Sequence, residues 1–294
     1  MERGAILKAK RTLASLKLIK IFSASQAEAV TKNGDSFTQG DDEMPNDNTV
    51  KSLHKAIAVL ECFTTQEPEL SITEISSKLG LYKSTVHNIV STFEQHGYIE
   101  RNPQTNKCHL GMKVLKLTHV FNVNHSLTNV IRPIIRDLAN LVNENVYFAV
   151  PDGGEILYLE GAYPSSYLSR TMIGEKAEMY CTGLGKAILA FLPEEEQKKA
   201  ILLQSLKSYT PTTITDRQML VEEIARIRKR GYSIDNMEHE IGIKCVSVPV
   251  ISRSGELLGA MSVSGPSLRF GEEAIPVFYS ELSKSAKCIS DQIP

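Results

Sequence analysis

The segment SITEISSKLGLYKSTVHNIVSTFEQHG, which begins at Ser71, constrains the fold more than any other part of the chain. Ser71 and Glu74 have the spacing of a capping box, which starts a helix, and Gly80 allows the left-handed turn that ends one. After only Leu81 and Tyr82 comes KSTVHNIVSTFEQHG, in which apolar side chains recur at helical spacing from Val86 to Phe93. Two short helices joined this tightly are typical of a helix-turn-helix, whose second helix reads the DNA major groove with its N-terminal residues.

A further helix is predicted just before this motif, in VKSLHKAIAVLECF. Its apolar side chains recur at near-helical spacing and need a surface to pack against: Leu53, Ile57, Val59, Leu60 and Phe63. After the motif, GYIERNPQTNKCHLG has the pattern of two strands around a turn at residues 102–106, which would form a hairpin wing. The three helices and the hairpin together predict a winged helix-turn-helix over residues 49–111.

The predicted DNA contacts lie on the second helix of the motif and on the wing. They are Lys83, Ser84, Thr85, His87, Asn88, Arg101 and Lys107. The whole chain has a formal net charge of -1, so binding would depend on specific contacts rather than on bulk charge. Some winged helices recognise proteins instead of DNA, and from the motif alone that alternative stays open.

The rest of the chain predicts a linker helix and a second domain. The stretch MKVLKLTHVFNVNH, residues 112–125, keeps an apolar stripe and is expected to join the domains and to pair with its own copy. Beyond it, helices are expected in SLTNVIRPIIRDLANLV, GLGKAILAFL, DRQMLVEEIARIRKRG and EEAIPVFYSELSKSAKCISDQI. Strands are expected in VYFAVPDGGEILYLEGA, YLSRTMI and IKCVSVPVISRSGELLGAMSVSG. This alternation predicts an antiparallel sheet covered by helices, with a pocket at the sheet face.

Three motifs, in this order, resemble the IclR-type bacterial transcription regulators. They are TEISSKLGLYKSTVHNIVSTFEQHGYIER, YCTGLGKAILAFL and GYSIDNMEHEIGIKCVSVPVISRSGELLGAMSVSGPSLR. The resemblance covers residues 50–294 and implies an α+β chain: an N-terminal winged helix-turn-helix joined by a linker helix to a GAF-like effector-binding domain, residues 126–294. It also implies a homodimer or a dimer of dimers on double-stranded operator DNA, with neither a cofactor nor a metal. Tyr82 and Asn88 stand where proline and arginine are common in the family, so the operator sequence does not carry over.

The resemblance also implies an effector pocket, carried over residue by residue. It would comprise Gly183, Leu184, Asp235, Ile243, Cys245, Ser262 and Ser264. Free N–H groups at a helix start, with serine hydroxyls and a thiol nearby, suit the carboxylate of a small organic-acid effector. Asp235 would accept hydrogen bonds from the other end of the ligand. Without the resemblance, a strand-end cap for Asp235 and core packing for Cys245 are the simpler interpretations.

These parts predict a ligand-responsive regulator. It is expected to repress a catabolic operon, and a small carboxylate or sugar-acid effector is expected to relieve that repression. An activator built from the same parts is the alternative. An enzyme is the rival class, because Cys181, His239 and Cys245 could form a thiol-based catalytic pair or a zinc site. Their spacing matches no metal signature, and no nucleophile elbow, P-loop or dinucleotide fingerprint is present, so we expect no enzyme.

Residues 1–48 differ from the rest of the sequence. A stretch in which basic and apolar residues are mixed is followed by a polar, acidic stretch. Lys17 and Lys20 interrupt the apolar run, which argues against a signal peptide, and no run is long enough to span a bilayer. A disordered or weakly ordered tail is predicted, with Met44 as an alternative start. Five scattered cysteines without a CxxC pair indicate reduced thiols and a cytoplasmic chain. No membrane partner is expected.

Overall fold

The computed structural model describes residues 50–124, 126–164 and 172–293, which form two compact units. The tail expected over residues 1–48 and most of the strand expected in YLSRTMI lie outside these residues. Within the described residues, every helix is too short or too polar to cross a membrane.

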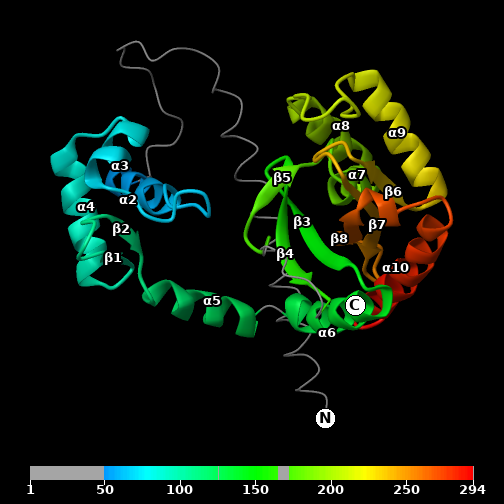
Figure 1. Ribbon diagram of the computed structural model, residues 1–294, viewed down its shortest axis with the longest axis horizontal. Helices are drawn as coiled ribbons and strands as arrows, with labels where there is room; N and C mark the ends of the chain where they lie inside the picture. Colours follow the sequence, from blue (N-terminus) through cyan, green and yellow to red (C-terminus); the bar gives the residue numbers. More distant parts are fainter. Residues whose placement is uncertain (1–49, 125, 165–171, 294) are drawn as a thin grey trace. The chain divides into compact units, whose positions relative to one another are not determined.

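The first unit contains four helices and a hairpin (Figure 1). They are α2 (Lys51–Glu61), α3 (Ile72–Leu79), α4 (Lys83–Gln95), β1 (Ile99–Arg101), β2 (Cys108–Leu110) and α5 (Lys113–Asn124). The predicted capping box is confirmed, since Ser71 Oγ accepts from Glu74 N at 3.2 Å and Glu74 Oε2 accepts from Ser71 N at 2.7 Å. Gly80 ends α3 at φ 63°, and only three residues, Gly80, Leu81 and Tyr82, separate α3 from α4. The helix-turn-helix and its wing therefore form as the sequence predicts.

The core of this unit is small, and only part of the apolar stripe predicted for α2 packs against it. Its buried members are Val59, Leu70, Ile75, Val86, Val90, Ile99 and Cys108. Leu60 and Phe63 pack against them, whereas Leu53 and Ile57 remain 59% and 52% exposed. Only the C-terminal part of α2 packs against this core, so the surface predicted to cover Leu53 and Ile57 does not come from the described core.

The second unit is one six-stranded sheet with helices on both faces (Figure 1). In chain order the elements are α6 (Ser126–Val142), β3 (Asn145–Asp152), β4 (Glu155–Ala162), β5 (Lys176–Glu178), α7 (Gly183–Phe191), α8 (Glu194–Leu203), α9 (Arg217–Arg230), β6 (Ser233–Asn236), β7 (Ile243–Ile251), β8 (Leu257–Pro266), η2 (Ser267–Arg269) and α10 (Ala274–Ser290). The strand order is β5-β4-β3-β8-β7-β6, and all neighbours are antiparallel, as predicted.

Each face of this sheet has its own hydrophobic core. On one face, α6 and α10 cover side chains such as Phe148 and Val248. On the other face, α7, with α8 and α9 packed around it, covers Ala149 and Ala260. Alternation of side chains along the strands thus buries apolar residues on both sides. The α+β architecture expected from the sequence is confirmed.

The strand register gathers polar side chains on the α7 face. Asp235 lies opposite Cys245, Cys245 opposite Ser264, and Ser264 opposite Asn145, which makes one row across four strands. Two residues along β7, a second row follows: Ser233, Ser247, Ser262 and Tyr147. Residues two apart on a strand share a face, so both rows lie on the same side of the sheet.

Candidate functional sites

The first candidate site is the exposed side of α4. Four predicted contacts are exposed: Lys83, Ser84, His87 and Asn88. Thr85 is half-buried, while Val86 and Val90 on the opposite side are fully buried and attach the helix to its core. No side chain caps the N-terminus of α4, so its first N–H groups and the positive end of the helix dipole are available to an anion.

The two predicted wing contacts are held by acidic neighbours. Arg101 Nε donates to Glu94 Oε1 at 2.9 Å, and Lys107 Nζ donates to Glu74 Oε1 at 3.2 Å. Hydrogen bonds from Ser71, assisted by Lys107, lower the pKa of the Glu74 carboxyl to about 2. A DNA contact by either cation would require its partly exposed ion pair to open.

The second candidate site is a cavity of about 350 Å³ between α7 and the sheet. All predicted pocket residues line it: Gly183, Leu184, Asp235, Ile243, Cys245, Ser262 and Ser264. They come from α7, β6, β7 and β8, and the register of the two polar rows explains why residues so far apart in sequence meet. Cys245 Sγ donates to Ser264 Oγ at 3.1 Å, so thiol and hydroxyl already form a small network.

The start of α7 fits against the sheet because the CTGLG motif contains glycine twice. A Cβ on Gly183 would lie 2.5 Å from Ser247 Oγ, and a Cβ on Gly185 would lie 2.3 Å from the Met179 Cα. Thr182 caps the helix by accepting from Gly185 N at 3.1 Å. The N–H groups of Gly183 and Leu184 remain in the first turn without an intrahelical partner, and both residues line the cavity.

The carboxyl group of Asp235 is the strongest acid–base feature of the cavity. Burial raises its pKa to about 7, against the opposing effects of a hydrogen bond from Glu238 N at 2.7 Å and of Lys186. Near neutral pH this group can therefore both donate and accept a hydrogen bond. Lys186 is itself 1% exposed and is paired with Glu238, and its Nζ donates to the Ile234 carbonyl at 2.7 Å.

Several cavity residues were missed by sequence reasoning. Tyr147 and Tyr158 form an aromatic wall with ring centroids 5.6 Å apart, and Arg269 forms a two-pronged ion pair with the buried carboxylate of Glu144. No local sequence pattern indicates that Glu144 and Arg269 form a pair, because they are 125 residues apart. Lys186 lies outside the cavity lining, and it could have been noticed in the sequence, since it is the single charge in GLGKAILAFL, whose residues are otherwise apolar.

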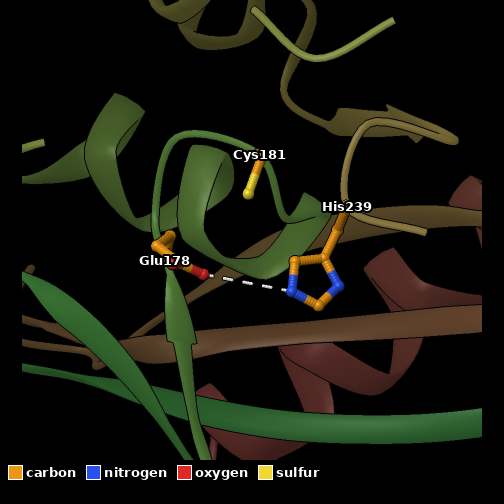
Figure 2. Close-up of side chains that lie close together, drawn as sticks. All are labelled: Glu178, Cys181 and His239. Carbon is orange, nitrogen blue, oxygen red and sulfur yellow. Dashed lines mark ion pairs between the residues drawn. The ribbon is translucent and has the colours of Figure 1, made fainter. Parts of the chain in front are cut away.

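A third cluster brings together two of the three residues considered for thiol or zinc chemistry. Cys181 and His239 lie beside Glu178, with one ligand-type atom from each residue within 4.8 Å of the others (Figure 2). His239 Nε2 is 4.0 Å from Glu178 Oε2. Cys245 is not part of this cluster, and it bonds to Ser264 instead. Burial raises the pKa of both the Cys181 and the Cys245 thiols, so each is protonated at neutral pH.

Comparison with known proteins covers both units. The model described as "Bacterial transcriptional regulator IclR C-terminal" matches residues 119–291, and the IclR helix-turn-helix model matches residues 52–103. The HTH-type transcriptional regulator XynR of Escherichia coli K12 is 30% identical, over 82% of this chain and 96% of that protein. The transcriptional repressor IclR of the same organism is 29% identical, over 83% of this chain and 90% of its own.

Among solved structures, an IclR homologue from Microbacterium hydrocarbonoxydans, crystallised in complex with 4-hydroxybenzoate, has the same fold. The TM-score is 0.72 at 23% identity, with 82% of this chain and 98% of that chain covered.

Proposed function

Because this chain belongs to the IclR family of bacterial transcriptional regulators, we propose that it binds operator DNA through α4 and changes its DNA affinity when a small organic acid occupies the cavity. The proposed division is a winged helix-turn-helix over residues 49–111, a linker helix over 112–125 and an effector domain over 126–294. A protein acting on chromosomal operators would work in the cytoplasm.

One observation carries the proposal. The seven residues expected to bind an effector come from four elements of the second unit and line a single cavity. That cavity offers unpaired helix N–H groups at one place, and serine hydroxyls and a carboxyl that titrates near neutrality at others. Such a set suits an acid that also carries a hydroxyl or carbonyl group. The bound 4-hydroxybenzoate of the Microbacterium homologue has both features.

DNA reading would require two copies of the chain. α2 exposes Leu53 and Ile57, and α5 exposes Leu117 and Val120 on one side, and apolar surface of this kind favours burial against a second copy. A two-fold dimer would place two copies of α4 in successive major grooves about 34–36 Å apart, on a near-palindromic site.

Regulation would follow from linkage between cavity and DNA. A tenfold change in operator affinity requires the effector to favour one dimer arrangement by about 1.4 kcal/mol. We propose that the effector lowers operator affinity and so relieves repression, because a relative of similar length is the Escherichia coli repressor IclR. An activator would use the same linkage with the opposite sign.

Thiol catalysis has little support at these sites. The nucleophile in such enzymes is the thiolate, whereas burial raises the pKa of both the Cys181 and the Cys245 thiols. The relatives named above are transcriptional regulators.

The test begins with selection of genomic DNA fragments by the purified full-length protein, followed by a thermal-shift screen of small hydroxy and keto acids. A hit stabilises the protein as its concentration rises, by an amount that gives its Kd. Gel-shift titration with and without the hit then measures the linkage. No enriched fragment would contradict the DNA-binding proposal, and a hit without effect on DNA affinity would contradict the regulatory one.

Matched variants separate the two sites. Ser84→Ala with His87→Ala should weaken operator binding at least tenfold, because base contacts contribute about 1–3 kcal/mol each, and leave effector affinity unchanged. Ser262→Ala should do the reverse. Equal loss of both activities in either variant would indicate damaged folding rather than a lost contact.

A further inference from the structure

The cluster of Glu178, Cys181 and His239 combines the side-chain types that bind transition metals. The three residues come from separate segments: the end of β5, the loop before α7 and the loop between β6 and β7. Their side chains converge on a common point (Figure 2), and one ligand-type atom from each lies within 4.8 Å of the others.

Neighbouring contacts fix these side chains in place. Tyr209 donates its hydroxyl to Glu178 Oε1 and packs its ring 5.5 Å from that of His239. Thr182 Oγ1 donates to the Glu178 carbonyl at 2.7 Å, which fastens the turn that carries Cys181. Orientation of metal ligands by such outer contacts is a regular feature of metal sites.

We propose that Glu178, Cys181 and His239 bind a Zn²⁺ ion. In a tetrahedral zinc site, with bonds of about 2.0–2.3 Å, ligand atoms stand about 3.3–3.7 Å from one another. The present separations, up to 4.8 Å, must shorten by about 1 Å to reach this range. Thiolate and imidazole favour zinc over Mg²⁺ and Ca²⁺, which take oxygen ligands. Binding forms a Zn–S bond and releases the Cys181 thiol proton to solvent.

Three protein ligands leave one zinc position open. Structural zinc sites normally have four protein ligands, whereas three ligands with an open position leave room for water or a small molecule. His239 is also part of the lining of the 350 Å³ cavity. The open position therefore lies at the edge of that cavity, where the ion would add positive charge beside Asp235 and Glu240, two acidic lining residues.

The experiment uses full-length protein freed of metal with a chelator and then titrated with zinc against a chromophoric competitor. We expect one zinc per chain with Kd below about 1 μM. Cys181→Ser, His239→Asn and Glu178→Gln should each raise that Kd at least tenfold. Cys288→Ser, which alters an exposed thiol on α10, and His54→Asn, which alters an exposed histidine on α2, should leave it unchanged.

Two spectroscopic readouts identify the ligands. Cobalt substitution should give a sulfur-to-metal charge-transfer band that disappears in Cys181→Ser and persists in Cys288→Ser. Zinc X-ray absorption should detect one sulfur in the first coordination shell, and two sulfurs would overturn the assignment by implicating a second thiol. Unchanged zinc affinity in Cys181→Ser, or binding weaker than 100 μM in the unmodified chain, would also overturn the proposal.

Folding of the variants is checked by circular dichroism without metal. If Cys181→Ser melts early because its site is buried, the partly exposed His239→Asn and Glu178→Gln decide the outcome. Both substitutions retain a polar side chain, and Glu178→Gln also retains its size. A zinc affinity in these two variants equal to that of the unmodified chain would refute the site.

Discussion

At the scale of single residues, Gly183 limits how α7 can meet the sheet. We predict that Gly183→Ala destabilises the protein by about 1–3 kcal/mol, because its Cβ would lie 2.5 Å from Ser247 Oγ and 3.2 Å from the Cys245 Cβ. Chemical denaturation measures the loss. Gly271→Ala is the control, since its Cβ meets nothing within 4 Å, and a similar loss there would contradict the packing argument.

The buried pair of Lys186 and Glu238 gives a second prediction at this scale. Lys186→Met should cost about 3–5 kcal/mol, because it leaves the Glu238 carboxylate buried without its cation. The double variant Lys186→Met with Glu238→Met should recover most of that stability, since it removes both charges together. Urea unfolding of the two single variants and the double variant measures the coupling. Losses of unfolding free energy that simply add would show that the two side chains do not stabilise each other.

Sequence reasoning reached the cavity residues unevenly. Asp235, Cys245 and Ser264 could be predicted only through the resemblance to the IclR-type regulators, because they stand in the motifs that carry it. Tyr147 and Arg269 could not, because their place in the cavity follows from strand pairing and from a contact across 125 residues. Cys181 and His239 were grouped from the sequence with Cys245, but the third residue beside them is Glu178, because Cys245 lies opposite Ser264 in the sheet and bonds to it.

At the scale of elements, helices with strong end signals were predicted best. α3 begins and ends where its capping box and Gly80 indicate. α8 was missed because EEEQKKAILL is highly charged and has little apolar periodicity, and β5 and β6 are too short to show alternation. What covers the exposed half of α2 could not be predicted, because apolar spacing shows which residues share a face and not what packs against that face.

The α3 capping box gives a pH prediction. Its hydrogen bonds lower the pKa of Glu74 from 4.5 to about 2 in the folded chain, so ionised Glu74 favours folding above pH 4.5, and that contribution disappears as the pH falls toward 2. Glu74→Gln keeps an acceptor for the Ser71 N–H but carries no charge. We expect it to melt below the unmodified chain at pH 7 and to approach it near pH 2.5.

Thermal melts of the full chain across this range provide the measurement. Glu61→Gln, which removes an exposed carboxylate of α2 outside the capping box, corrects for the change in net charge. A gap between Glu74→Gln and the unmodified chain that stays constant with pH would contradict the electrostatic explanation.

At the scale of the whole molecule, the proposed dimer depends on the apolar side of α5. Leu117→Glu should shift the chain toward monomers and weaken operator binding at least tenfold, because a carboxylate would be buried in the interface. Sedimentation velocity and gel-shift titration measure the two effects. His119→Glu places a carboxylate on about the opposite side of α5 from Leu117, and it should leave both the oligomeric state and operator binding unchanged. Monomers in the unmodified chain at micromolar concentration would contradict the dimer.

The close contact between Gly183 and Ser247 also has a consequence for engineering this protein as a biosensor. Because the start of α7 lies this close to the sheet, any larger side chain at Gly183 would collide with Ser247 Oγ and crowd the Cys245 Cβ, so substitutions on this side of the cavity are poorly accommodated. New analyte preferences must therefore come from the wall, where Tyr147, Tyr158 and Met172 can be exchanged for smaller residues. Mutant libraries confined to those three codons should yield more folded, responsive variants than libraries of equal size at the start of α7.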